Sequence, residues 1–130
     1  MPTKGDSFLI NGTACLQIIT INENSFRKYL NNVDFIQKYI FPGGFLPSKK
    51  KLYDLSANNG LKIDQYNSYG FHYSNTLKMW KDEFLKKWEE ISRQGFDNKF
   101  KRMWDFYLSY CEAGFKSENI DLIQFSLQNR

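Results

Sequence analysis

The sequence of 130 residues predicts one α/β domain, because strand-like and helix-like segments alternate along it. Three observations support this class. The run from Thr13 to Ile21 is apolar and β-branched, which is typical of a strand. Two later segments repeat apolar residues at helical spacing, and the tail from Ile120 to Leu127 places its apolar residues on one face, as a strand does.

The first predicted strand, Thr13 to Ile21, follows a turn signal at Asn11-Gly12. Its nearly continuous apolar run suits a strand covered on both faces, the usual condition in a parallel sheet, so we expect a central strand. Three predicted strands are too few to flank such a strand on both sides, and an open edge invites pairing. The sheet is therefore predicted to be incomplete beside this strand.

Short helical segments should follow the first strand. Asn22 to Ser25 offers capping residues for them. The residues at helical spacing are Phe26, Tyr29, Leu30, Phe35, Ile36, Tyr39 and Ile40. We expect this pattern to end at Phe41, because Pro42 disfavours helix in the residue before it and Gly43-Gly44 permits a sharp turn.

Ser48 is a candidate N-cap for a further short helix, which carries Leu52 and Leu55. The sequence Asn58-Asn59-Gly60 should end that helix. Alternation of apolar and polar residues then predicts a strand from Leu61 to Tyr66.

Two long amphipathic helices precede the final strand. The first begins near Tyr73 and is predicted to continue until Gly95 ends it. Its apolar positions are Leu77, Trp80, Phe84, Trp88 and Ile91. The second helix has the same pattern at Phe100, Met103, Trp104, Tyr107, Cys111 and Phe115.

Composition limits the classes of function. The formal charge is +4 with a pI near 9.0, and Lys49-Lys50-Lys51 is the one cluster of positive charge. This mild bias suits an anionic membrane surface or an ordinary soluble surface. No helix-turn-helix spacing, zinc-ligand set or RNA-binding aromatic motif is present, so we expect neither a nucleic-acid partner nor a metal site. Apolar runs fall short of the roughly 20 residues of a membrane-spanning helix, which predicts a cytoplasmic protein with peripheral contact at the inner membrane.

Cys15 and Cys111 lie in regular apolar patterns without Cys-x-x-Cys spacing. We expect both to be reduced and buried, as small hydrophobic residues of the core. Aromatic residues make up 18% of the chain, so they should form buried stripes or line an apolar pocket.

Three segments together resemble a known enzyme family. They are Phe41-Pro42-Gly43-Gly44-Phe45-Leu46-Pro47-Ser48, Gly70-Phe71-His72-Tyr73-Ser74-Asn75-Thr76-Leu77 and Met103-Trp104-Asp105-Phe106-Tyr107-Leu108. From about Phe8 to its end, the chain resembles the C-terminal part of the cyclopropane-fatty-acyl-phospholipid synthase family, which includes mycolic acid cyclopropane synthases. These enzymes use S-adenosylmethionine to modify lipid double bonds.

The resemblance implies the C-terminal portion of a class I, Rossmann-like methyltransferase fold, as one partial domain over residues 1–130. Thr13 to Ile21 would be its fifth strand and Leu61 to Tyr66 its sixth. Ile120 to Leu127 would be the seventh, inserted antiparallel between the other two, and about five helices accompany these three strands. The sequence has no Gly-rich phosphate-binding fingerprint, so the cofactor-binding N-terminal part is expected to be absent.

The resemblance also implies a site. In the family the alkene of a phospholipid acyl chain is methylated, and a bound bicarbonate ion removes a proton from the carbocation that forms. Tyr73, Ile19 and Gln17 match family positions at that ion, through a hydroxyl, a backbone group and an amide that replaces histidine in some members. Phe41 and Tyr73 match positions that face the acyl chain. His72, the single histidine, is expected to be a structural or supporting residue.

Two functions are compatible with these expectations. The first is the lipid- and bicarbonate-facing part of a cyclopropane fatty acid synthase-like methyltransferase. Alone it would be inactive and bind no cofactor tightly, until a companion chain supplied the N-terminal half. The second is a non-catalytic module, whose aromatic pocket and Lys49 to Lys51 cluster dock on anionic lipid or on a partner that supplies the missing strands. Tyr73 and Phe41 also fit core positions by pattern alone, so whether this chain is itself an enzyme stays open.

Overall fold

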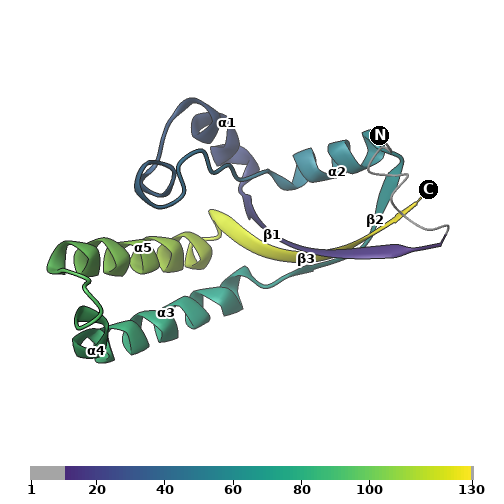
Figure 1. The fold of residues 1–130 in the computed structure, drawn as a ribbon. Coiled ribbons are helices and arrows are strands. Elements are labelled where there is room, and N and C mark those ends of the chain that lie inside the picture. The colour runs from purple at the N-terminus through teal and green to yellow at the C-terminus, as the bar shows by residue number, and fades with distance from the viewer. Residues whose placement is uncertain (1–10, 130) are drawn as a thin grey trace.

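A three-stranded sheet with helices packed along it and at one of its ends makes up residues 11–129, the part of the chain that the computed structural model describes (Figure 1). The predicted α/β class is confirmed, and the resemblance that begins near Phe8 starts outside the described residues. The elements in chain order are β1 (Thr13–Ile21), α1 (Glu23–Asn31), the π-helical turn η2 (Ile36–Ile40), α2 (Lys49–Asn58), β2 (Leu61–Ser68), α3 (Gly70–Lys86), α4 (Trp88–Ser92), α5 (Asn98–Lys116) and β3 (Ile120–Asn129).

The last strand lies in the middle of the sheet. β3 pairs antiparallel with β1 on one side and with β2 on the other, which gives the order β1-β3-β2. In this register Ile18 lies opposite Ile123, and Asn67 lies opposite Gln124. The predicted antiparallel insertion of the final strand between the other two is confirmed.

β1 lies at one edge of the sheet, and the prediction that it is covered on both faces is wrong for the described residues. Only Thr20 and Ile21 at its carboxyl end are buried, whereas Leu16 is 40% exposed. Within residues 11–129 the outer edge of β1 has one bridge, from Ile21 to Ser48. The apolar sequence of β1 is typical of a strand that has neighbours on both sides. Among the described residues the outer edge of β1 is open, which is the side on which the sequence predicted an incomplete sheet.

Side chains that alternate along the strands form an apolar cluster on each face of the sheet. On the face covered by α2, Ile123, Phe125 and Leu127 of β3 join Leu61 of β2, and Leu52 of α2 packs against them. The three β3 residues share one face as predicted.

The opposite face packs against α3 and α5 only at one end of the sheet, and these two helices lie side by side and extend beyond that end (Figure 1). The buried cluster there joins Leu77 of α3 to Leu108, Cys111 and Phe115 of α5 and to Leu122 of β3. Phe115 is 1% exposed, so α5 is anchored by its last turn where β3 begins.

Polar side chains cap three of the helices. The Oδ1 of Asn22 accepts the N–H of Asn24 at 2.8 Å, and the Oγ of Ser48 accepts the N–H of Lys51 at 3.1 Å. Both caps agree with the sequence prediction. Asp97 caps α5 in the same manner.

The first long helix is interrupted, which the sequence did not predict. α3 begins at Gly70, upstream of the expected start near Tyr73, and gives way to the short α4 at Lys87, where φ is −96° and ψ is 12°. Gly95 follows α4 with a φ of +103°, a conformation that favours glycine, and ends the helical segment as predicted.

The two cysteines differ in environment. Cys111 is buried in the core, as predicted, whereas Cys15 on edge strand β1 is exposed, so the prediction that both are buried is wrong for Cys15. Among the described helices, none combines the length and apolar character needed to cross a bilayer.

Replacing Ile123 by alanine should lower the free energy of unfolding by about 2–5 kcal/mol, because its side chain is 0% exposed at the centre of the sheet. Leu30→Ala is the matched control. The Leu30 side chain is 52% exposed on α1, so its loss should change stability by less than about 1 kcal/mol. Urea titration followed by circular dichroism measures both, and equal effects would contradict the central position of Ile123.

Candidate functional site

The N-terminus of α3 is tied to β3 by the carboxylate of Asp121. Its Oδ1 accepts the backbone N–H of Gly70 at 2.9 Å, and its Oδ2 accepts the hydroxyl of Ser68 at 2.6 Å. The partial positive charge of the first N–H groups of a helix favours an acidic group there. These bonds fix the direction in which α3 leaves the sheet, and therefore where Tyr73 lies one turn later.

Gly70 approaches Asp121 so closely that a larger residue does not fit. A Cβ at Gly70 would overlap the Asp121 carboxylate and lie 3.2 Å from the Asp121 Cα. Glycine is required here by this close approach, because side-chain atoms at Gly70 have no space. The glycine of the Gly-Phe-His-Tyr segment thus has a structural explanation.

Tyr73 is half-buried among aromatic side chains. Its ring stands edge-on to those of Phe115 and Trp80, with centroid distances of 4.9 and 5.7 Å. Burial raises the pKa of the Tyr73 hydroxyl, and nearby Cys111 adds to this effect. The hydroxyl is neutral at pH 7 and has no hydrogen-bond partner among residues 11–129, which leaves it available as a donor.

Ile19 packs its side chain against the cluster between α3, α5 and β3, while its backbone groups point elsewhere. The N–H of Asn22 donates to the Asn119 carbonyl at 2.8 Å on the β3 side, whereas the N–H of Ile21 donates to the Pro47 carbonyl at 3.0 Å on the opposite side. These directions alternate along an antiparallel strand. Ile19 therefore presents its N–H and C=O at the outer edge of β1.

Tyr107 and Cys111, one turn apart on α5, belong to the same region. The Tyr107 hydroxyl lies close to the Cys111 thiol and near enough to Tyr73 to interact electrostatically with both groups. Burial raises the pKa of Tyr107 to about 12 and that of Cys111 to about 11, so both groups keep their protons at neutral pH. The sequence predicted this helix but not the pairing of Tyr107 with Cys111 as part of the site. The spacing of four residues, which places a hydroxyl and a thiol on one side of a helix, could have indicated it.

Phe41 borders this region from the surface. Its N–H donates to the Ile36 carbonyl at 2.8 Å and ends η2, so the helical pattern stops at Phe41 as predicted. The N–H of Gly44 donates to the Phe41 carbonyl at 2.8 Å, which folds the turn back. The Phe41 ring stands edge-on to Tyr107 at a centroid distance of 6.4 Å and is 57% exposed.

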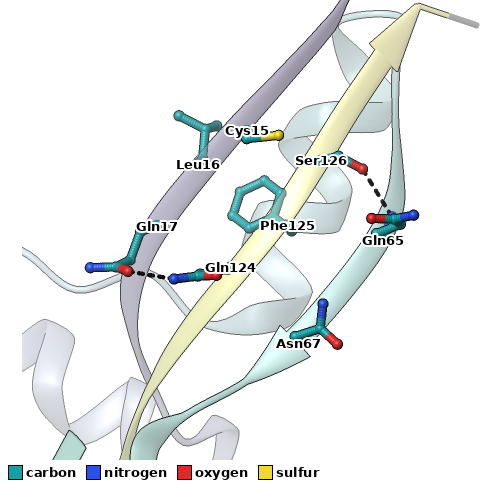
Figure 2. A pocket seen from close by; sticks show the side chains of 8 residues that line it. All are labelled: Cys15, Leu16, Gln17, Gln65, Asn67, Gln124, Phe125 and Ser126. Carbon is teal, nitrogen blue, oxygen red and sulfur yellow. Dashed lines mark hydrogen bonds between the residues drawn. The ribbon is translucent and has the colours of Figure 1, made fainter.

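Gln17 lies on β1 two residues before Ile19, and the two side chains share one face of the strand. Its Oε1 accepts the Nε2 of Gln124 at 2.8 Å. Figure 2 shows both side chains in a shallow groove of about 320 Å³ across the three strands. The groove is lined by Cys15, Leu16, Gln17, Gln65, Asn67, Gln124, Phe125 and Ser126. Amide groups dominate this lining, so the groove offers many neutral hydrogen-bond donors and acceptors.

The structure thus brings most of the predicted site residues into one region. Tyr73 and Ile19 pack on the same cluster, and Phe41 reaches it from the loop after η2. Gln17 precedes Ile19 by two residues on the same face of β1 and lies outside that packed cluster. His72 is exposed on α3, beside the site and outside its packed cluster.

None of the three strands among residues 11–129 leads into a Gly-rich turn. In α/β folds a nucleotide cofactor lies at the carboxyl ends of strands, beside a Gly-rich turn. β1 is followed directly by Asn22, which caps α1, and the space at Gly70 after β2 is taken by Asp121. Over the same residues, no group of three or more His, Cys, Asp or Glu side chains is arranged to hold a metal ion.

Comparison with known proteins identifies relatives of the chain. The family model for mycolic acid cyclopropane synthetase matches residues 6–125. Tuberculostearic acid methyltransferase UfaA1 of Mycobacterium tuberculosis is 38% identical over 117 residues, which are 89% of this chain and 27% of that protein. The cyclopropane-fatty-acyl-phospholipid synthase of Escherichia coli is 39% identical over 94 residues, 72% of this chain and 24% of that one. The chain spans about a quarter of the length of these relatives.

Solved structures have the same fold over this region. The chain aligns with mycolic acid cyclopropane synthase CmaA1, solved in complex with SAH and CTAB, with a TM-score of 0.76 and 27% identity, over 92% of this chain and 45% of that one. It aligns with the cyclopropane synthase MmaA2 of Mycobacterium tuberculosis with a TM-score of 0.80 and 25% identity, over 95% and 46% of the two chains.

Gly70→Ala should destabilise the protein by about 1–3 kcal/mol, the usual cost of overpacking, because the new methyl group meets the Asp121 carboxylate. In a helix without this contact the same change would stabilise by up to about 1 kcal/mol. A double-mutant cycle with Asp121→Ala, measured by urea titration, isolates the contact. The double mutant should be more stable than the sum of the single effects predicts, and additive effects would contradict the close approach.

Proposed function

The chain belongs to the mycolic acid cyclopropane synthetase family, and from this premise we propose that it forms the acyl-facing and bicarbonate-facing part of an S-adenosylmethionine-dependent methyltransferase. Its substrate would be the unsaturated acyl chain of a phospholipid. The observation that supports this function best is the cluster of neutral donor groups on the half-buried Tyr73 and Tyr107 and the buried Cys111.

A carbocation formed on an acyl chain is destroyed by water, so a site for such chemistry has to be apolar. Tyr73 and Tyr107 provide aromatic surface there, and Leu77 and Phe115 close the floor of the cluster. Phe41 adds an exposed ring at the rim, whose π face can stabilise a nearby cation. None of these groups carries charge at neutral pH, which keeps water from being drawn in.

An anion beside this surface would need donors, and Tyr73 supplies one through its hydroxyl. The N–H of Ile19, which points to the outer edge of β1, supplies a second. Gln17 supplies a third, because the Nε2 of Gln124 already bonds to the Gln17 oxygen and thereby leaves the Gln17 amide nitrogen as a donor. Unlike histidine, Gln17 cannot take up a proton, so in this proposal the bound bicarbonate acts as the base.

The proposed enzyme also needs strands that this part of the chain does not contain. None of the three strands in residues 11–129 leads into a Gly-rich turn for the nucleotide cofactor, and the outer edge of β1 has free strand positions at Gln17 and Ile19 among these residues. We expect a cofactor-binding half to pair with this edge. Residues 1–130 by themselves are expected neither to bind S-adenosylmethionine tightly nor to turn over substrate.

A non-catalytic lipid-binding module that docks through Lys49 to Lys51 is the alternative. Two of these lysines are engaged by the protein's own side chains, since the Nζ of Lys50 lies 2.8 Å from Asp54 and that of Lys49 lies 4.2 Å from the ring centroid of Tyr66. Such contacts weaken the argument that this cluster is a dedicated lipid site.

A hybrid enzyme tests the proposed function. The region of the Escherichia coli synthase that aligns with this chain is replaced by the matching residues of this chain, and methyl transfer to an oleoyl phospholipid is measured. We expect turnover by the hybrid and none by the purified chain alone. Tyr73→Phe in the hybrid should lower kcat by roughly 100-fold, the usual cost of removing one donor aimed at a reacting charge, and added bicarbonate should restore part of the rate.

Tyr69→Phe is the matched control, because it removes the hydroxyl of a 39% exposed tyrosine at the start of the same helix. It should leave kcat unchanged. A folded but inactive hybrid, an effect of Tyr73→Phe no larger than that of Tyr69→Phe, or methyl transfer by the purified chain alone would each contradict the proposal.

A further inference from the structure

One exposed side of α5 carries aromatic residues that pack with those of η2. The ring of Phe35 lies 4.6 Å from that of Phe106 and 6.4 Å from that of Tyr110, measured between centroids. Tyr39 lies 5.3 Å from Phe35. We call these four residues the aromatic face. Tyr39, Phe106 and Tyr110 are 54%, 52% and 40% exposed, so the face is built mainly from aromatic rings in contact with solvent.

Basic side chains border the aromatic face. The Nζ of Lys38 lies 5.2 Å from the ring centroid of Tyr39. Arg102 is exposed and precedes Phe106 by four residues, so the two lie on one stripe of α5. The acidic group in contact with the face is Asp34, whose Oδ2 accepts the hydroxyl of Tyr110 at 3.4 Å. Two cations and one carboxylate are therefore associated with the aromatic face, which gives it a net positive surrounding.

A groove of about 700 Å³ adjoins the aromatic face, between α1, η2 and α5. Tyr110 lines it, together with Val33, which is 71% exposed, and apolar residues such as Ile36. Ile36 also packs against the buried cluster that holds Tyr73. Ile36 therefore belongs both to the groove beside the aromatic face and to the surroundings of the cluster that holds Tyr73.

We propose that the aromatic face docks this chain on an anionic lipid bilayer. Aromatic rings are favoured at the boundary between headgroups and acyl chains, and Lys and Arg beside them attract anionic headgroups. Aromatic rings alone would be sufficient to bind a protein partner. The neighbouring cations of Lys38 and Arg102 instead complement a negatively charged surface. The inference rests on the proposed function, because an acyl substrate held in a bilayer has to be reached from the bilayer surface.

Vesicle flotation at low salt tests this docking surface. The purified chain is mixed with vesicles of phosphatidylcholine alone or with one third phosphatidylglycerol. We expect binding to the phosphatidylglycerol vesicles that falls as salt rises, and little binding to phosphatidylcholine. The double variant Lys38→Glu/Arg102→Glu should bind at least about tenfold more weakly, since each cation near an anionic surface contributes a large factor.

Lys49→Glu/Lys51→Glu is the matched control, because it changes the charge by the same amount on α2. It should retain most of the binding. Two further double variants test the apolar contribution separately from the charge. Tyr39→Ser/Phe106→Ser should lose binding. Phe71→Ser/Met79→Ser should keep it, because these side chains, 63% and 67% exposed, lie on α3. Circular dichroism confirms that each variant is folded.

Four outcomes would overturn the docking surface. They are failure of the wild-type chain to float, equal losses in the two charge variants, equal losses in the two apolar variants, and formation of a dimer through the aromatic face in sedimentation without flotation. The proposed function is tested separately by methyl transfer in the hybrid enzyme with detergent-dispersed substrate, which needs no docking. If the chain floats but the hybrid is inactive, the proposed function is contradicted and the docking surface stands. If the hybrid is active but the chain does not float, only the docking surface is contradicted.

Discussion

The rest of the structure depends on the position of β3, the last strand, between β1 and β2. Every strand pair among residues 11–129 is a pair with β3, so neither β1 nor β2 has a place in the sheet without it. Ile123 at the centre of β3 is completely buried. Side chains on the two faces of β3 belong to both apolar clusters. Because β3 follows all the described helices in the chain, its pairing with β1 joins residues about 100 positions apart. This arrangement also leaves the outer edge of β1 open.

The same strand positions the candidate site. Asp121 and Leu122 are neighbours on β3 and point in opposite directions. Asp121 holds the start of α3, and Leu122 enters the cluster against which Tyr73 and Ile19 pack. The site is thus built from α3, whose direction is fixed by a carboxylate, from α5 beside it, and from a strand edge whose backbone is unpaired within residues 11–129. Its hydroxyl and thiol groups are neutral at pH 7, and burial raises their pKa values further, which suits chemistry that has to exclude water.

Sequence patterns predicted the elements well where short-range physics decides them. The caps at Asn22 and Ser48, the end of helix at Phe41 and the alternation of β3 all depend on neighbouring residues. The exposure of β1 could not be predicted in this way. An apolar strand is expected to be buried, but its sequence does not say which part of a protein buries it. Tyr107 and Cys111 were missed as site residues for a related reason: their positions on α5 resemble ordinary core until Tyr73 is packed against them.

Amide hydrogen exchange along β1, followed by NMR on the isolated chain, tests the central claim most directly. If β3 is the inner neighbour and the outer edge is open, the N–H groups of Ile18 and Thr20 should be protected while those of Gln17 and Ile19 exchange rapidly. Ile21 should be protected again through its bond to Pro47. Uniform protection from Gln17 to Thr20, or rapid exchange at Ile18 and Thr20, would contradict both the strand order and the open edge.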